Sequence, residues 1–265
     1  MAGLQAPSTR GLVMPKLRLS TPRDRDSIEL DRALQAGEIE LPPFVRWSRF
    51  KETFRWAQGE HMTLVGGTGS GKTTLARQLL PLREYVVVLA TKARDDSLYR
   101  PLQKMGFVMR DEFDGDWERT PKVIFRPPLD EPTKAGRERQ REAFRLALIE
   151  IFQQGNWCIY GDEVRYLTQN LSLQPEFELL WLQGRSLGVS MVVSTQRPVS
   201  IPILAFEAQH MFIWRFSAKR DIDTVAEFAG DVAPMVKATV PRLPRHEALY
   251  IRPDENLLLR TKVGT

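Results

Sequence analysis

Residues 66–73 read Gly-Gly-Thr-Gly-Ser-Gly-Lys-Thr, which matches the phosphate-binding loop (P-loop) pattern G-x-x-x-x-G-K-[ST]. Glycines allow a tight turn in which successive N–H groups surround a phosphate, and the helix expected from about Gly71 adds its positive end. Lys72 is expected to reach the β- and γ-phosphates, and the Thr73 hydroxyl to ligate Mg²⁺. An apolar strand candidate, Met62–Val65, precedes the loop, as a nucleotide site requires. The candidate nucleotide-binding residues are Gly66, Gly67, Thr68, Gly69, Ser70, Gly71, Lys72, Thr73 and Thr74.

Short apolar strands alternate with helical stretches on both sides of this loop. The expected strands are His61–Val65, Tyr85–Ala90, Val123–Phe125, Trp157–Tyr160, Val189–Ser194, Met211–Phe216 and, last, Ala248–Ile251. The expected helices are Gly71–Leu80, Arg137–Gln153, Glu176–Leu187 and Asp221–Ala229, with a further short one at about Asp24–Gly37. Such alternation predicts an α/β fold with a mainly parallel central sheet flanked by helices. Residues 106–135, rich in Pro, Asp and Arg, are expected to be irregular.

An acidic pair, Asp162-Glu163, ends the apolar stretch that begins at Trp157. The carboxyl ends of parallel strands share one edge of a sheet, so Asp162 is expected to lie beside the P-loop. There Asp162 can hold Mg²⁺ through its water shell, and Glu163 can polarise an attacking water as a general base. An acidic pair after a strand also caps the next helix in many proteins, and the pair alone leaves that alternative open.

Two further polar side chains flank the strand Val189–Ser194. Gln196 is expected at the phosphate edge, where its amide can hydrogen-bond the γ-phosphate or the water; its alternative is an ordinary loop residue. Arg185 is expected at the opposite end of the strand, where it can reach the nucleotide of a neighbouring subunit, or simply lie on the surface. Rival arginines for that role are Arg165, Arg197 and Arg215.

The composition excludes several classes of protein. The 265 residues carry 38 Lys and Arg against 33 Asp and Glu, a net charge of +5, with 42% hydrophobic residues. This composition indicates a globular protein and permits a nucleic-acid partner without requiring one. The lone Cys158 excludes a disulfide framework, and no apolar run approaches the length of a bilayer span. We expect a cytoplasmic protein without direct membrane insertion.

The first 43 residues are expected to form a basic, proline-containing arm or an ordinary disordered terminus. Residues 44–235 are assigned to the P-loop domain, and residues 236–265 to a C-terminal extension that adds an edge strand. The basic residues of the arm are Arg10, Lys16, Arg18 and Arg23.

Two other patterns admit two interpretations each. An aromatic cluster precedes the P-loop strand and either stacks on adenine or other bases, or closes the core at the sheet edge. Arginines at every fourth position from 137 to 145 either track phosphates or form a solvated face with nearby glutamates. The aromatic cluster consists of Trp47, Phe50, Phe54 and Trp56.

The sequence resembles the FtsK/HerA superfamily of P-loop ATPases in four motifs. These are the P-loop, the strand ending in Asp-Glu, the Gly-Arg-x-x-Gly segment at 184–188 and the Thr-Gln-Arg-Pro segment at 195–198. The resemblance covers roughly residues 47–230. It implies a RecA-like core in which the acidic strand lies away from the strand that follows the P-loop strand along the chain. It also implies a ring of subunits, a pentamer or hexamer, with nucleotide at each interface and double-stranded DNA in the pore.

Carried onto this sequence, the resemblance makes Lys72 and Thr73 the Walker A pair and Asp162 and Glu163 the Walker B pair. Gln196 becomes the sensor and Arg185 the finger supplied in trans. The chain has no candidate membrane helix and few residues after Ala229, so it looks most like the small viral DNA-packaging ATPases.

The expected function is therefore Mg²⁺-dependent ATP hydrolysis that drives double-stranded DNA translocation in viral genome packaging. A viral portal or vertex protein, or a membrane protein, is a further candidate partner. Two alternatives stay open: a nucleotide-gated assembly or secretion ATPase, and a P-loop phosphotransferase for a small acceptor.

Overall fold

The computed structural model describes residues 25–114, 119–128, 133–200 and 202–264. The predicted basic side chains Arg10, Lys16, Arg18 and Arg23 lie outside the described residues. Within the described residues, nine strands form one sheet in the order β3-β4-β2-β5-β6-β1-β7-β8-β9. The strands are β1 (Met62–Val65), β2 (Val86–Leu89), β3 (Val108–Arg110), β4 (Lys122–Phe125), β5 (Cys158–Gly161), β6 (Ser190–Thr195), β7 (His210–Trp214), β8 (Glu247–Arg252) and β9 (Leu257–Lys262).

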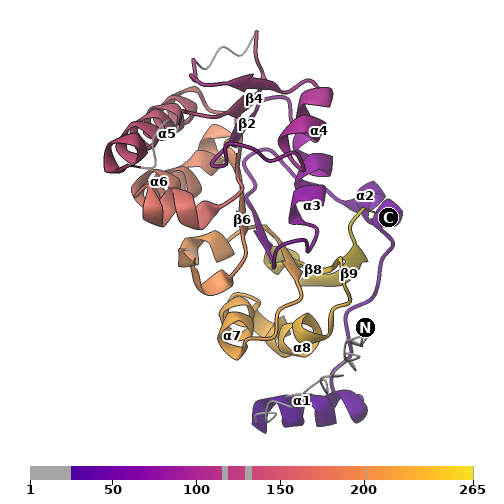
Figure 1. The fold of residues 1–265 in the computed structure, drawn as a ribbon. Coiled ribbons are helices and arrows are strands. Elements are labelled where there is room, and N and C mark those ends of the chain that lie inside the picture. Colours follow the sequence, from indigo (N-terminus) through magenta and orange to yellow (C-terminus); the bar gives the residue numbers. More distant parts are fainter. Residues whose placement is uncertain (1–24, 115–118, 129–132, 201, 265) are drawn as a thin grey trace, which may run out of the picture.

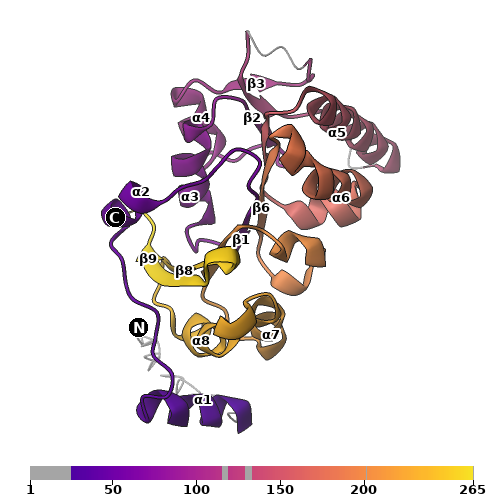
Figure 2. The ribbon, with the colours of Figure 1, turned by 180° about the vertical axis from the view of Figure 1, so that it is seen from behind.

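Helices cover both faces of the sheet. Figure 1 shows α3 and α4 on one face and α5 and α6 on the other, and Figure 2 shows the same layers from behind. The helices are α1 (Arg25–Gln35), α2 (Trp47–Thr53), α3 (Lys72–Leu79), α4 (Tyr99–Lys104), α5 (Lys134–Gln154), α6 (Gln174–Gln183), α7 (Lys219–Glu227) and α8 (Ala233–Thr239). The predicted α/β fold with a mainly parallel sheet flanked by helices is confirmed.

Alternate residues of the central strands enter two separate cores. On β2, Val86 and Val88 join the core under α3 and α4, whereas Val87 and Leu89 join the core under α5 and α6. Successive side chains of a strand point to opposite faces, so a strand covered on both sides must be apolar throughout. This explains why the central strands appear in the sequence as continuous apolar runs.

The pairing pattern fixes which loops meet. All neighbours from β3 to β7 pair in parallel, and β8 and β9 are added antiparallel after β7. The acidic strand, β5, was expected to lie away from β2, the strand that follows the P-loop strand β1 along the chain. This expectation was wrong, because β5 pairs directly with β2. It is β6 that separates β5 from β1. The loops after β1, β5 and β6 therefore share one edge of the sheet.

The structure differs from the expected elements in three places. Residues 106–135, expected to be irregular apart from the strand predicted at Val123–Phe125, also contribute β3 and the start of α5, and the predicted strand is present as β4. The strand expected to be last, at 248–251, is followed by another, β9, with which it forms an antiparallel pair. The short helices α2, α4 and α8 were not predicted. The proposed domain boundaries at 44, 235 and 236 stay predictions, although residues after 236 continue the same sheet.

A segment from the N-terminal side runs beside the outermost strand β9. The Arg260 N–H donates to the Pro43 carbonyl, and the Val45 N–H donates to the Arg260 carbonyl, both at 2.8 Å. The Arg260 guanidinium also donates to the Pro42 carbonyl at 2.9 Å. Residues 42–45 therefore occupy the hydrogen-bonding edge at the middle of β9.

The aromatic cluster and the arginines of α5 each had two interpretations, and the residues described next favour the structural one. Trp47 and Phe50 are 3% and 2% exposed and pack into the core that includes α3, so they close the sheet edge and are not available to a base. On α5, Arg141 lies 3.9 Å from Glu138 and Arg145 lies 2.7 Å from Glu142. These two arginines are therefore paired on their own helix. None of the described helices is long and apolar enough to cross a bilayer.

Candidate functional site

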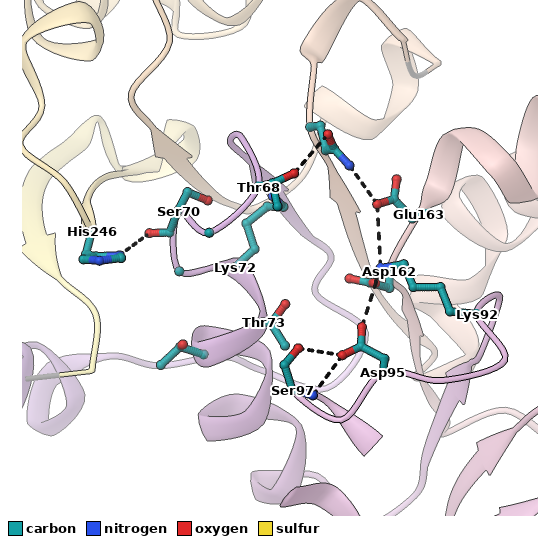
Figure 3. Close-up of a pocket in the computed structure, with 14 residues that line it drawn as sticks. Thr68, Ser70, Lys72, Thr73, Lys92, Asp95, Ser97, Asp162, Glu163 and His246 are labelled. Atoms are coloured by element: carbon teal, nitrogen blue, oxygen red, sulfur yellow. Dashed lines mark hydrogen bonds and ion pairs between the residues drawn. The ribbon is translucent and has the colours of Figure 1, made fainter. Parts of the chain in front are cut away.

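A pocket of about 480 Å³ opens at the edge of the sheet where β1, β5 and β6 end. The P-loop forms its floor and the acidic pair lies along one wall (Figure 3). Gln196 also lines the pocket. The lining residues are Thr68, Gly69, Ser70, Gly71, Lys72, Thr73, Thr74, Lys92, Asp95, Ser97, Asp162, Glu163, Gln196 and His246. Of the predicted site residues, only Gly66, Gly67 and Arg185 are not among them.

The P-loop is shaped by the absence of side chains at two of its glycines. A Cβ at position 66 would lie 2.7 Å from the Cβ of Trp214, and one at position 71 would lie 3.2 Å from the Trp214 indole nitrogen. Gly71 also has a φ of 127°, which favours glycine. The Gly66 N–H donates to the Thr195 carbonyl at 3.1 Å, which joins the loop to the end of β6.

Lys72 and Thr73 begin α3, so their side chains project from the helix start into the pocket. The Lys72 ammonium donates to the carbonyls of Gly66 and Gly67. Burial lowers the pKa of Lys72, and the charges of Asp162 and Glu163 oppose that effect. The P-loop lysine and the acidic pair therefore lie within electrostatic reach of one another, as the sequence predicted.

Asp162 is nearly buried and is held from two sides. The Tyr160 hydroxyl donates to Asp162 Oδ1 at 2.9 Å, and the Lys92 ammonium donates to Oδ2 at 2.6 Å. Burial and the neighbouring Asp162 charge raise the pKa of Tyr160 well above its usual value, which keeps the hydroxyl protonated as a donor. Asp162 is thus a carboxylate held in place at the wall of the pocket.

Gln196 connects the P-loop to Glu163. Its Nε2 donates to Glu163 Oε1 at 3.1 Å, and its Oε1 accepts from the Thr68 hydroxyl at 3.4 Å. Because β6 lies between β1 and β5, the residue after β6 is the one that can touch both loops. Gln196 therefore contacts both the P-loop and the loop that carries Glu163, so a movement of either loop would be transmitted to the other.

Sequence reasoning missed Lys92, which follows β2 in the chain. Its ammonium lies 2.6 Å from Asp162, 3.5 Å from Asp95 and 3.9 Å from Glu163. Burial alone would lower its pKa, but the hydrogen bond and charge of Asp162 outweigh that effect and raise it. The signal was available, since Lys92 follows a predicted strand and the ends of parallel strands meet at one edge.

Arg185 lies at the far side of the sheet from this pocket. Its carbonyl would be 2.7 Å from a Cβ at Gly59, which precedes β1. Its side chain is exposed. Among the rivals, Arg197 pairs with Asp221 at 3.1 Å and Arg165 donates to Gln169 at 3.2 Å. Arg215 lines a second hollow beside the P-loop. The role of a trans finger stays a prediction for Arg185.

The three histidines and Cys158 do not gather at a metal site. Cys158 is buried in β5, and burial raises its pKa to about 12. His61 and His210 are buried at other positions, and only His246 lines the pocket. Over the residues that the structure describes, no group of three or more His, Cys, Asp or Glu side chains is arranged to hold a metal ion.

Comparison with known proteins places these features in context. No family model matches the chain. In sequence, the chain is 32% identical over 124 residues to DNA packaging ATPase P9 of Enterobacteria phage PRD1. That match covers 44% of this chain and 53% of P9, so the chain spans about half the length of that relative.

Two solved structures share the fold. The genome packaging NTPase B204 from Sulfolobus turreted icosahedral virus 2, in complex with ATP-γS, superposes with a TM-score of 0.59 at 15% identity, over 78% of this chain and 99% of B204. The cytoplasmic domain of the type VII secretion ATPase EccC of Thermomonospora curvata gives a TM-score of 0.51 at 16% identity, over 78% of this chain and 26% of that chain. The resemblance to small viral packaging ATPases, predicted from the motifs, is confirmed by these similarities.

Proposed function

We propose that this chain is a Mg²⁺-dependent ATPase that drives viral genome packaging. One observation carries the proposal: a single pocket brings Lys72 and Thr73 of the P-loop to the Asp162-Glu163 pair and Gln196. A P-loop alone binds phosphate, whereas hydrolysis also needs a carboxylate on the metal side and a group that orients water. The similarity to packaging ATPase P9 supports the biological setting.

The donor set fits Mg²⁺. The Thr73 hydroxyl and the Asp162 carboxylate line the same pocket, and Mg²⁺ prefers a few such hard oxygens together with the phosphates of its substrate. The Oδ2 atom of Asp162 pairs with Lys92, which also lines the pocket. Bound there, Mg²⁺ would neutralise charge on the phosphate oxygens.

The chain's own groups then divide the remaining work. Lys72 exchanges its contacts with the Gly66 and Gly67 carbonyls for the β- and γ-phosphates. Glu163 accepts a proton from the attacking water, and Gln196 holds Glu163 in place through the 3.1 Å hydrogen bond. Through Thr68, Gln196 also senses whether a phosphate occupies the P-loop.

The finer proposal is a homo-oligomeric ring of five or six subunits that translocates double-stranded DNA in the host cytoplasm and docks at a viral vertex. Arg185 would act on the nucleotide of the neighbouring subunit, since it lies on the far side of the sheet from its own P-loop. Contacts to the DNA would be made with its phosphate backbone and would weaken steeply with salt.

The test is an ATPase assay with and without duplex DNA, together with a size measurement in a non-hydrolysable ATP analogue. A packaging motor should hydrolyse ATP severalfold faster with duplex DNA and form a ring with the analogue. Hydrolysis indifferent to DNA would instead favour an assembly or secretion ATPase, the alternative supported by the shared fold of EccC. ADP formation that requires a small acceptor would identify a phosphotransferase.

A further inference from the structure

The nucleotide pocket has two ends. Glu163 and Asp162 lie at one end, and His246 lies across the P-loop at the other (Figure 3). The general base and the P-loop lysine mark where the γ-phosphate must sit. The γ-phosphate is the terminal group of a nucleoside triphosphate, so the ribose and base lie farther along the P-loop, away from Glu163. They are therefore directed toward Thr74 and His246.

The antiparallel strand β8 explains how His246 reaches this edge. β8 begins at Glu247 and pairs antiparallel with β7. The residue before an antiparallel strand lies at the edge where the parallel strands end. β5 is two strands from β1 on one side and β8 is two strands from β1 on the other, so Glu163 and His246 flank the P-loop from opposite directions.

The backbone and one ring edge of His246 are fixed. Its φ is 66°, a left-handed conformation that is unfavourable for residues other than glycine and is often retained at functional sites. Its Nδ1 lies 3.3 Å from the Ser70 carbonyl, and a carbonyl accepts only, so Nδ1 carries the proton and donates. The ring is half-buried, and its remaining surface is free to contact a ligand.

We infer that the face of the His246 imidazole stacks on the nucleobase of a nucleoside triphosphate bound at the P-loop. The inference rests on the proposed function. Of the aromatic cluster predicted as an alternative, Trp47 and Phe50 are buried in the core, and Phe54 and Trp56 are half-buried and pack against it. Because every base presents a π-face, a stacking platform binds nucleotides with little regard for the identity of the base.

The test compares three ligands, ATP, ADP and inorganic tripolyphosphate, each with Mg²⁺, on the full chain and on His246→Asn. Asparagine tolerates left-handed backbone and keeps an N–H donor for Ser70, so the loop should keep its shape. We expect His246→Asn to bind ATP and ADP about tenfold more weakly or worse, since base–aromatic stacking has that magnitude. Its affinity for tripolyphosphate should be unchanged, whereas Lys72→Ala should weaken all three ligands.

A fluorescent 2-aminopurine triphosphate gives a second readout, because stacking quenches this base. Quenching by the wild-type chain and its loss in His246→Asn would support the inference. Equal losses of ATP and tripolyphosphate affinity in His246→Asn, or unchanged ATP affinity, would overturn it. Absence of binding of ATP, ADP and tripolyphosphate alike to the wild-type chain would overturn the proposed function itself, which separates the two failures.

Discussion

The Lys92 ammonium lies 2.6 Å from the Asp162 carboxylate, at the position where the proposed function requires a metal cation. The lysine and the cation compete for one oxygen, and Lys92 also lies 3.9 Å from Glu163. We expect Lys92→Met to leave two adjacent carboxylates without their countercharge. Asp162 is nearly buried but the Lys92 end of the ion pair is half-exposed and screened by solvent, so the pair should contribute about 1 kcal/mol and the loss of stability should be small.

Mg²⁺ should replace the missing charge. Without nucleotide, Mg²⁺ should therefore raise the melting temperature of Lys92→Met more than that of the wild-type chain. The matched control is Lys104→Met, at an exposed lysine that ends α4. Identical Mg²⁺ responses in all three proteins would show that Lys92 does not occupy the cation position.

Glu163→Gln should keep ATP binding but lower turnover by at least about 100-fold, as loss of a general base does. The amide oxygen of glutamine still accepts from Gln196, so the geometry of the wall should remain. Asp162→Asn should instead raise the Mg²⁺ concentration needed for half-maximal turnover. The measurement is steady-state phosphate release beside equilibrium binding of ATP; near-normal turnover in Glu163→Gln would refute its role.

Arg185→Ala subunits and Lys72→Ala subunits should each be inactive alone, and their mixture should recover part of the activity. In a ring, some interfaces then pair an intact P-loop with an intact arginine. The control is the same mixing with Arg165→Ala in place of Arg185→Ala. If ATPase activity does not recover at any mixing ratio, the assignment of Arg185 as the trans finger is rejected.

Gly66→Ala should destabilise the protein by about 1–3 kcal/mol, the usual effect of overpacking. Its Cβ would lie 2.7 Å from Trp214 and 2.8 Å from the Ser70 hydroxyl. Gly67→Ala is the matched control, because a Cβ there meets nothing within 4 Å. Chemical denaturation without nucleotide measures both; equal losses would show that Trp214 does not define the loop.

Acid should weaken the fold through His61. This residue is buried, its Nε2 donates to the Trp181 carbonyl, and its Nδ1 accepts from the Met191 N–H. Burial lowers its pKa to about 4. Below about pH 6.5, His61 therefore binds a proton in the unfolded chain but not in the folded chain. The free energy of unfolding falls as the pH drops from that value toward 4.

His61 should lower the free energy of unfolding by about 2 kcal/mol at pH 5 relative to pH 7.5. Burial also lowers the pKa of His210, so part of the total pH dependence belongs to that residue. Urea denaturation of wild type and His61→Gln at pH 7.5 and 5 isolates the difference. Parallel pH profiles for the two proteins would contradict the assignment.

The chemistry at the pocket edge could be predicted because Glu163 and Gln196 closely follow apolar strands and Lys72 belongs to the P-loop motif. Their meeting needs only the rule that parallel strands end together. The order of those strands could not be predicted, since β6 inserts between β5 and β1 by long-range pairing. His246 was missed as a site residue because it precedes its strand, and only the antiparallel addition of β8 brings it to this edge.

Local sequence was a weaker guide at the two edge strands of the sheet. β3 has only three residues, Val108–Arg110, which is too short for an alternating pattern to mark it. β9 was missed although the hairpin turn before it, with Asn256 at a φ of 49°, carries typical turn residues.

Outermost strands tend to recruit strands from other molecules, which leads to fibres and domain exchange. At β9 this hazard is reduced within the chain itself, because residues 43 and 45 already use the N–H and C=O of Arg260. Pro42 and Pro43 have no N–H, so the covering segment cannot itself template another strand. The cover over the middle of β9 therefore lowers the tendency of copies of this chain to polymerise through that strand.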